Sequence, residues 1–195
     1  LNQIAILLIA ATIAVIYSSA YGYTMEKIAY KPLRKAPRLS ALISAIGMSL
    51  FLQNYVLLAQ TSDFLPFPAL IPDFKWLEPW EHIVRSSQVV IFSTTAIVMV
   101  LLTFLIKFTR IGKAMRAVSQ DKEMAMLVGI DVNRVISVTF IVGSTTAAIG
   151  GVLIASHIGQ INFYIGFIAG IKAFVAAVLG GIGSIPGAVL GSLVL

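Results

Sequence analysis

The chain has 195 residues, of which 58% are apolar or aromatic, only 11% are charged and none is cysteine. Soluble domains carry about 25% charged residues, so this chain has too few polar groups to cover a surface that faces water. The composition therefore indicates a protein whose solvent is largely lipid, and the mean hydropathy of +0.96 agrees with this interpretation. Because the chain starts at Leu1 and stops at Leu195 within an apolar stretch, we expect a piece of a longer membrane protein.

Five apolar stretches of 17 to 21 residues follow one another along the chain, and a sixth begins near Ala188. As helices rising about 1.5 Å per residue, they are long enough to cross a hydrocarbon core of about 30 Å. Helices are expected because backbone groups in lipid must bond internally and the stretches lack the strict polar alternation of barrel strands. The predicted fold class is all-α, a polytopic integral membrane helical bundle with a single transmembrane domain over residues 1–195. The predicted spans are Ile4–Ala20, Leu39–Ala59, Val89–Phe108, Val135–Ala155 and Phe163–Leu179.

The net charge of +6 is distributed unevenly among the connections between these spans. Residues 21–38 carry five basic residues and one acid, and residues 107–134 carry six basic residues and three acids. Residues 61–86 carry four acids and two basic residues, together with Trp76 and Trp80, and favour an irregular interfacial segment. The alternation follows the positive-inside rule, so we expect the first and third connections in the cytoplasm, the second outside, and no nucleic-acid partner.

Small residues recur at every fourth position in the last third of the chain. Such stripes allow helix backbones to approach closely, which predicts tight packing between membrane helices. Pro186 should break a helix, so the segment from Gly180 to Gly191 is predicted to be either a cytoplasmic turn or a re-entrant helix. The glycines predicted to pack helices together are Gly143, Gly151, Gly181, Gly183 and Gly187.

The chain shows no pattern typical of a catalytic centre. It has two histidines, no H-E-x-x-H pair and no acid within a predicted span, and its glycine-rich segment lacks the G-x-x-x-x-G-K-[ST] pattern of a phosphate loop. We therefore predict a transport subunit without catalytic residues, metal site or cofactor, whose ATP chemistry would come from another chain. A passive small-solute channel is the rival class, and a membrane-embedded enzyme is disfavoured by the missing groups.

A short helix is predicted within the third connection. Ser119 or Asp121 is its predicted N-cap, Gly129 its predicted C-terminal stop, and Asp131 the predicted cap of the next span. The alternative is a solvated connector with an interfacial helix. The predicted apolar face of the short helix comprises Met124, Leu127 and Val128.

Several stretches resemble a known family of transporters. Glu123-Met-Ala125, followed by three residues and Gly129, resembles the E-A-A-x-x-x-G loop by which permease subunits of ABC importers engage their ATPase. The I-x-L-P half of that motif is absent, because Val138-Thr-Phe-Ile occupies the region. Residues 29–43, running on to residues 52–54, and residues 170–188 closely resemble permeases of high-affinity branched-chain amino acid ABC importers, and the most specific run is Lys172-Ala-Phe-Val-Ala-Ala-Val-Leu-Gly-Gly.

The resemblance implies a permease domain that forms half of a translocation pathway for leucine, isoleucine or valine. The implied partners are a second homologous permease, cytoplasmic ATP-binding subunits and an external amino-acid-binding protein, assembled in the lipid bilayer of a bacterial or archaeal-type cytoplasmic membrane. Urea-type or amide-type ABC permeases share the general plan and are the alternative substrate class. The residues implied in ATPase coupling are Ser119, Asp121, Glu123, Met124, Ala125, Leu127 and Gly129.

Three polar residues within predicted spans are candidates for the translocation pathway, namely Gln53, Asn54 and Lys172. An amide costs free energy in lipid unless it bonds across helices or faces water, so Gln53 and Asn54 either join helices or lie beside the substrate path. Lys172 lies nine residues past Phe163, about 13 Å along a helix. Its side chain either extends to the outer interface or faces the pathway.

Overall fold

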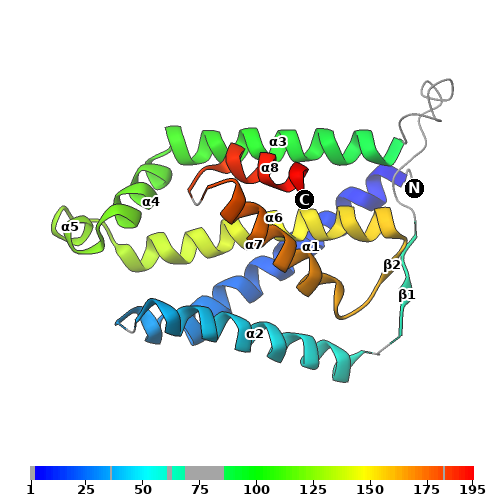
Figure 1. Cartoon of the computed structure of the whole chain (residues 1–195), viewed down its shortest axis with the longest axis horizontal. Coiled ribbons are helices and arrows are strands. Elements are labelled where there is room, and N and C mark those ends of the chain that lie inside the picture. Colours follow the sequence, from blue (N-terminus) through cyan, green and yellow to red (C-terminus); the bar gives the residue numbers. More distant parts are fainter. Residues whose placement is uncertain (1–2, 36, 61–62, 69–85, 182) are drawn as a thin grey trace.

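A computed structural model of the chain describes residues 3–35, 37–60, 63–68, 86–181 and 183–195. The described residues are largely helical, which confirms the predicted helical bundle (Figure 1). The longer helices are α1 (Gln3–Met25), α2 (Arg38–Ala59), α3 (Ser86–Phe108), α6 (Val132–Ile158) and α7 (Ile165–Leu179). The shorter helices are the π-helix η1 (Glu26–Tyr30), the 3-10 helix η2 (Pro32–Lys35), α4 (Arg110–Gln120), α5 (Lys122–Leu127) and α8 (Ile185–Val194).

Three of the described helical segments are long and apolar enough to cross a membrane: Ala5–Tyr30, Ser86–Phe108 and Val132–Ile158. The 22 residues of α2 are about 33 Å long, also sufficient for a span. By contrast, α7 has 15 residues and a length of about 22 Å, shorter than predicted. The reason is local, because the Asn162 side chain accepts a hydrogen bond from the Tyr164 backbone at 3.2 Å and delays the helix start.

The connections lie alternately at two ends of the bundle (Figure 1). Residues 26–35 and residues 109–131 lie at the same end, which we call the basic end, and a hydrogen bond from Arg34 to Asn133 joins the first segment to the start of α6, directly after the second. At the opposite end, the two-residue strands β1 (Leu65–Pro66) and β2 (Gln160–Ile161) pair antiparallel. The predicted interfacial segment with Trp76 and Trp80 lies outside the described residues.

Helices α1 and α6 form the most extensive helix contact of the described bundle. Ser18 donates to the Ser144 carbonyl at 3.0 Å, and the hydroxyls of Ser19 and Thr145 lie 3.0 Å apart. Gly22 is buried one turn further along, where an added Cβ would overlap the Ser144 side chain. Small and hydroxylated residues therefore bring these two backbones together, as is typical of membrane helix pairs.

Helices α7 and α8 form a hairpin with close backbone contact at three glycines. Of these three, only Gly187 was predicted to pack helices together. A Cβ at Gly180 or Gly187 would overlap the carbonyl group of the other residue, and one at Gly191 would overlap the Ala176 carbonyl. Pro186 lies in the first turn of α8, where its missing N–H costs little, and α8 begins at Ile185, before the predicted start at Ala188.

Four predicted packing glycines have other surroundings. Gly181 and Gly183 have φ values of +90° and +101° and lie in the turn between α7 and α8, so they permit the turn and do not pack helices. Added Cβ atoms at Gly143 and Gly151 on α6 would meet nothing within 4 Å in the described chain. Of the predicted set, only Gly187 makes a close helix contact among the described residues.

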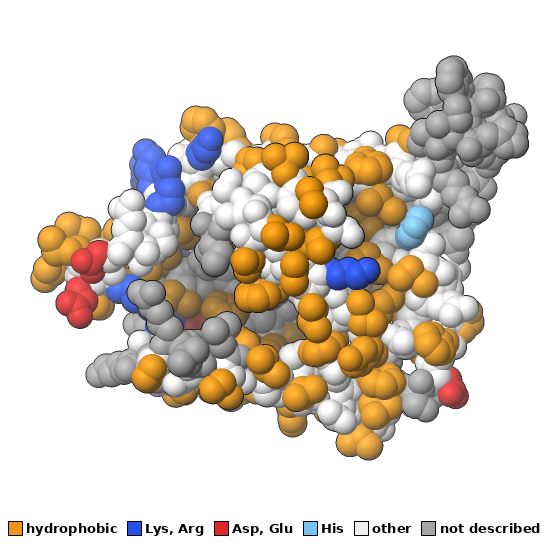
Figure 2. All heavy atoms as spheres, viewed as in Figure 1, with side chains coloured by type: hydrophobic (Ala, Val, Ile, Leu, Met, Phe, Trp, Pro, Cys, Tyr) orange, Lys and Arg blue, Asp and Glu red, His pale blue; other side chains and the backbone are white. Residues whose placement is uncertain are grey.

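Large apolar side chains are widely exposed, as expected for helices that do not face water. Ile16 and Leu58, for example, are 70% and 87% exposed. Figure 2 shows hydrophobic side chains across the middle of one face and basic side chains gathered over α4. The bundle therefore presents apolar surface at its middle and charge at its basic end.

The α1–α6 contact predicts a specific effect of enlarging Gly22. We expect Gly22→Val to lower the free energy of unfolding by about 1–3 kcal/mol more than Gly47→Val, because the new side chain must push α1 away from α6. Gly47 on α2 is the matched control, since a Cβ there meets nothing within 4 Å and the change in helix propensity is the same. The measurement is the thermal unfolding midpoint in detergent, and equal shifts for both variants would contradict the packing described here.

Candidate functional site

Helix α4 carries the chain away from α3 and presents the basic side chains. The Thr109 hydroxyl caps α4 by accepting from the Gly112 backbone at 3.0 Å, and buried Gly112 lies against the last carbonyls of α3. Val118 is buried, while Arg110, Lys113 and Arg116 are exposed. Helix α4 is therefore amphipathic, with its apolar side packed on the bundle and its basic side outward.

Helix α5 begins at a well-defined cap. One carboxylate oxygen of Asp121 accepts from the backbone N–H groups of Glu123 and Met124, at 2.8 and 3.1 Å. Asp121 is therefore the N-cap, and the alternative Ser119 is wrong as a cap, since it lies within α4 and donates to the Arg116 carbonyl at 2.8 Å. Ala125 is only 3% exposed and packs α5 against its neighbours.

The end of α5 is fixed as tightly as its start. The backbone N–H of Gly129 bonds to the Met126 carbonyl and that of Ile130 to the Ala125 carbonyl, both at 3.0 Å, which is the Schellman arrangement. Gly129 has the positive φ of +83° that this arrangement requires. Asp131 then caps α6, accepting from the backbone of Asn133 and Arg134 at 3.0 and 3.2 Å.

Four exposed apolar side chains lie on α5 and its C-cap residue, and we call them the α5 patch. Three of them were predicted from the sequence, whereas Met126 was missed because it departs from the helical spacing of the others. Next to the patch lies a cavity of about 600 Å³ whose lining includes Glu123, Gly129 and Arg34. The patch consists of Met124, Met126, Leu127 and Val128, which are 62%, 56%, 81% and 75% exposed.

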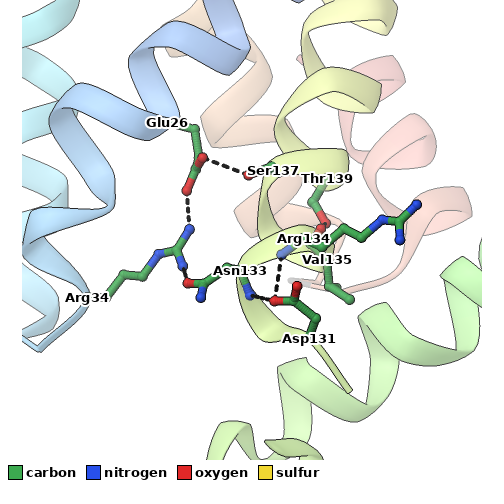
Figure 3. A network of polar contacts seen from close by, with 8 residues as sticks. All are labelled: Glu26, Arg34, Asp131, Asn133, Arg134, Val135, Ser137 and Thr139. Carbon is green, nitrogen blue, oxygen red and sulfur yellow. Dashed lines mark hydrogen bonds and ion pairs between the residues drawn. The ribbon is translucent and has the colours of Figure 1, made fainter. Parts of the chain in front are cut away.

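A polar network at the start of α6 links the two connections of the basic end (Figure 3). Glu26 is paired with Arg34 and accepts from the Ser137 hydroxyl at 2.8 Å, and Arg34 also donates to Asn133. This network was not predicted from the sequence. The one available signal was a single acid, Glu26, among the five basic residues of the first connection.

Each candidate pathway amide donates one hydrogen bond within its own helix. The Gln53 amide donates to the Ser49 hydroxyl at 3.3 Å, and the Asn54 amide donates to the Leu50 carbonyl at 2.8 Å. Neither amide is seen bonding to another helix, so the predicted interhelical role finds no support among the described residues. Gln53 is half-buried and Asn54 is exposed.

Lys172 lies at the middle of α7, on the wall of an apolar cavity. The cavity has a volume of about 570 Å³ and lies between α6, α7 and α8. Lys172 is the one charged residue of its lining. The apolar side chains that line the cavity include those of Ile154, Ile158, Ile165, Ile168 and Leu195.

Metal-binding groups do not cluster in the described part of the chain. No three side chains of His, Asp or Glu lie close enough together there to hold a metal ion. The arrangement is suited to protein contact at the α5 patch and to a small amphipathic solute at the Lys172 cavity.

Comparison with known proteins decides the family. The family described as "Branched-chain amino acid transport system / permease component" matches residues 1–195. The chain belongs to this family. The match confirms the resemblance that the sequence motifs indicated.

Three relatives share the name "High-affinity branched-chain amino acid transport system permease protein". LivH of Salmonella typhimurium is 50% identical and LivH of Escherichia coli K12 is 49% identical over 186 residues, which cover 93% of this chain and 60% of either relative. BraD of Pseudomonas aeruginosa is 48% identical over 199 residues, covering all of this chain and 65% of BraD. The chain thus spans about two thirds or less of the length of these relatives, and no solved structure matches it. The names are those of transport proteins and not of enzymes, as predicted.

Proposed function

We propose that this chain forms the membrane-spanning part of a permease that imports leucine, isoleucine and valine with energy from ATP. The observation that carries the proposal is α5, a short helix capped at both ends that, with its C-cap residue, presents the four exposed apolar side chains of the α5 patch at the basic end. The names of LivH and BraD support the substrate class. In this proposal residues 1–195 are one transmembrane domain, and ATP is hydrolysed on a separate chain.

The proposed orientation follows from charge. The basic end carries the excess of Lys and Arg, so we place it in the cytoplasm of a bacterial or archaeal cell, in contact with the ATP-binding subunits. The end with β1 and β2 then faces outside, where a binding protein would deliver the amino acid. The widely exposed apolar surface of the bundle is suited to lipid and to a second, homologous permease.

The proposed coupling acts through direct contact. A partner shifts a conformational equilibrium only through the difference between its interactions with the two states. For such a difference to move the permease, the ATPase must bind a rigid part of it. We propose that the α5 patch inserts into an apolar groove of the ATPase while Glu123 meets a basic group on its rim. The cap of Asp121 and the turn at Gly129 keep α5 rigid enough to transmit the movement.

Two substitutions test this contact. We expect Glu123→Lys to place a like charge opposite the basic group on the ATPase rim, and Gly129→Val to strain the turn by about 1–2 kcal/mol because a side chain is disfavoured at positive φ. Both should lower ATPase co-purification and ATP-driven uptake together, by about tenfold for each 1.4 kcal/mol of lost contact. The measurements are pull-down of the ATPase and uptake of labelled leucine into proteoliposomes.

The matched controls lie away from α5. Gln160→Lys places the same charge on β2 at the opposite end, and Gly47→Val makes the same glycine change within α2; both should leave ATPase co-purification unchanged. Normal co-purification and normal uptake with Glu123→Lys and Gly129→Val would show that the third connection is only a solvated connector.

The Lys172 cavity is the proposed part of the translocation pathway. An aliphatic amino acid has a carboxylate that the Lys172 ammonium can bind and a side chain that the surrounding isoleucines can contact. Gln53 and Asn54 are retained as pathway candidates, since their own-helix bonds leave an amide oxygen of each able to accept from a passing solute.

Charge removal at Lys172 tests the pathway. We expect Lys172→Gln to raise the KM for leucine about tenfold, as for loss of a hydrogen bond between charged groups, while ATPase co-purification stays normal. Lys172→Arg, which keeps the charge, should retain most of the affinity. The alternative is that Lys172 only extends to the outer interface, and an unchanged KM with Lys172→Gln would contradict the pathway role and favour that alternative.

A further inference from the structure

Glu26 is a carboxylate in an unusual place, directly after the apolar run of α1 and only 1% exposed. A buried carboxylate is costly unless both of its oxygens are paired. Here the two oxygens have different partners on different elements. One accepts from Arg34 of η2 and the other from Ser137 of α6, the latter at 2.8 Å.

Arg34 extends the connection to a second point on α6. Its guanidinium donates through one terminal nitrogen to Glu26 and through the other to the side-chain oxygen of Asn133 (Figure 3). The planar fork of arginine holds two acceptors in fixed relative positions, which a flexible lysine does not. One side chain of η2 therefore joins the end of α1 to the first turn of α6.

The first turn of α6 is also the place where α5 is anchored. Asp131 ends the connection that follows Gly129 and accepts from the backbone of Asn133, the residue whose side chain Arg34 holds. Arg34 also lines the cavity beside the α5 patch, together with Glu123 and Met126. The network thus lies between the proposed ATPase contact and the α1–α6 pair.

We propose that Glu26, Arg34, Asn133 and Ser137 form a clamp that makes α5 move as one body with α1 and α6. This inference rests on the proposed coupling through α5 and names the residues that carry the movement onward. They are positioning residues, which touch neither ATPase nor amino acid. Without the clamp, α5 and the start of α6 move without α1, so ATP is still hydrolysed but less of its energy reaches the pathway.

The test is the number of amino acid molecules imported per ATP hydrolysed, measured on the full permease–ATPase complex in proteoliposomes. We expect Arg34→Ala to lower this ratio about tenfold, since hydrogen bonds to a charged group are lost, while the ATPase still co-purifies. Lys31→Ala removes an exposed cation from the same connection and should leave the ratio unchanged. An unchanged ratio with Arg34→Ala, or loss of ATPase co-purification, would overturn the clamp.

A milder pair of substitutions keeps the test decisive where Arg34→Ala impairs folding. Ser137→Ala removes one bond to Glu26 and leaves the ion pair in place, whereas Thr139→Ala removes a hydroxyl that, among the described residues, bonds to the Val135 carbonyl of its own helix. We expect the ratio to fall for Ser137→Ala and to stay normal for Thr139→Ala. Equal ratios would contradict the clamp.

A covalent link in place of the hydrogen bond between Arg34 and Asn133 tests the clamp most directly. The chain has no cysteine, so Arg34→Cys with Asn133→Cys can be joined by a short bifunctional thiol reagent. We expect a low ratio before cross-linking and recovery towards the original ratio after it. Failure to recover would show that a mechanical link at this point is not what Arg34 supplies. These variants should keep the ATPase bound, whereas Glu123→Lys and Gly129→Val should lose it, so failure of the clamp and failure of the proposed function give different results.

Discussion

The burial of one carboxylate determines how the basic end of this protein is built. Glu26 follows the apolar run of α1, and its charge is acceptable there only because Arg34 and Ser137 take one oxygen each. Ser137 lies 111 residues further along the chain, so this requirement folds the first connection back onto the start of α6. The two basic connections consequently lie at the same end of the bundle, beside α5 (Figure 1).

The rest of the bundle divides into a firm part, whose helices are joined by hydrogen bonds, and a more open part, whose helices have fewer contacts or keep exposed apolar faces. Helix α6 is held to α1 by hydroxyl contacts near its middle and by the clamp at its start, and α5 is held to α6 by the turn at Gly129 and the cap at Asp131. By contrast, α2 makes its main contacts to η1 and η2, and the α7–α8 hairpin keeps exposed apolar faces. The firm part includes the proposed ATPase contact, and the open part presents the apolar surface proposed to meet lipid and a second permease.

Features set by local chemistry were predictable from the sequence, and features set by distant partners were not. Apolar runs predicted α1, α2, α3 and α6. The aspartate caps around α5 and the glycine with positive φ at its end were also predicted correctly, because each of these features depends on neighbouring residues. The length of α7 was overestimated, since hydropathy does not detect the Asn162 side chain that delays its start. The glycine stripe predicted close packing but not which glycines make it, because Gly180 and Gly191 meet the opposite backbone only once the hairpin has formed. The pairing of Glu26 with Ser137 could not be predicted either, because it forms only when segments more than a hundred residues apart have folded together.

The central claim is that the first connection and α5 move together during the transport cycle. Spin labels attached at Lys31→Cys and Lys122→Cys, both at exposed sites of the basic end, allow the distance between them to be measured by pulsed electron paramagnetic resonance in the assembled complex. We expect one narrow distance distribution that is the same without nucleotide, with ATP bound and after hydrolysis. A distance that changes between these states would mean that α5 moves independently of the first connection, and would contradict the account.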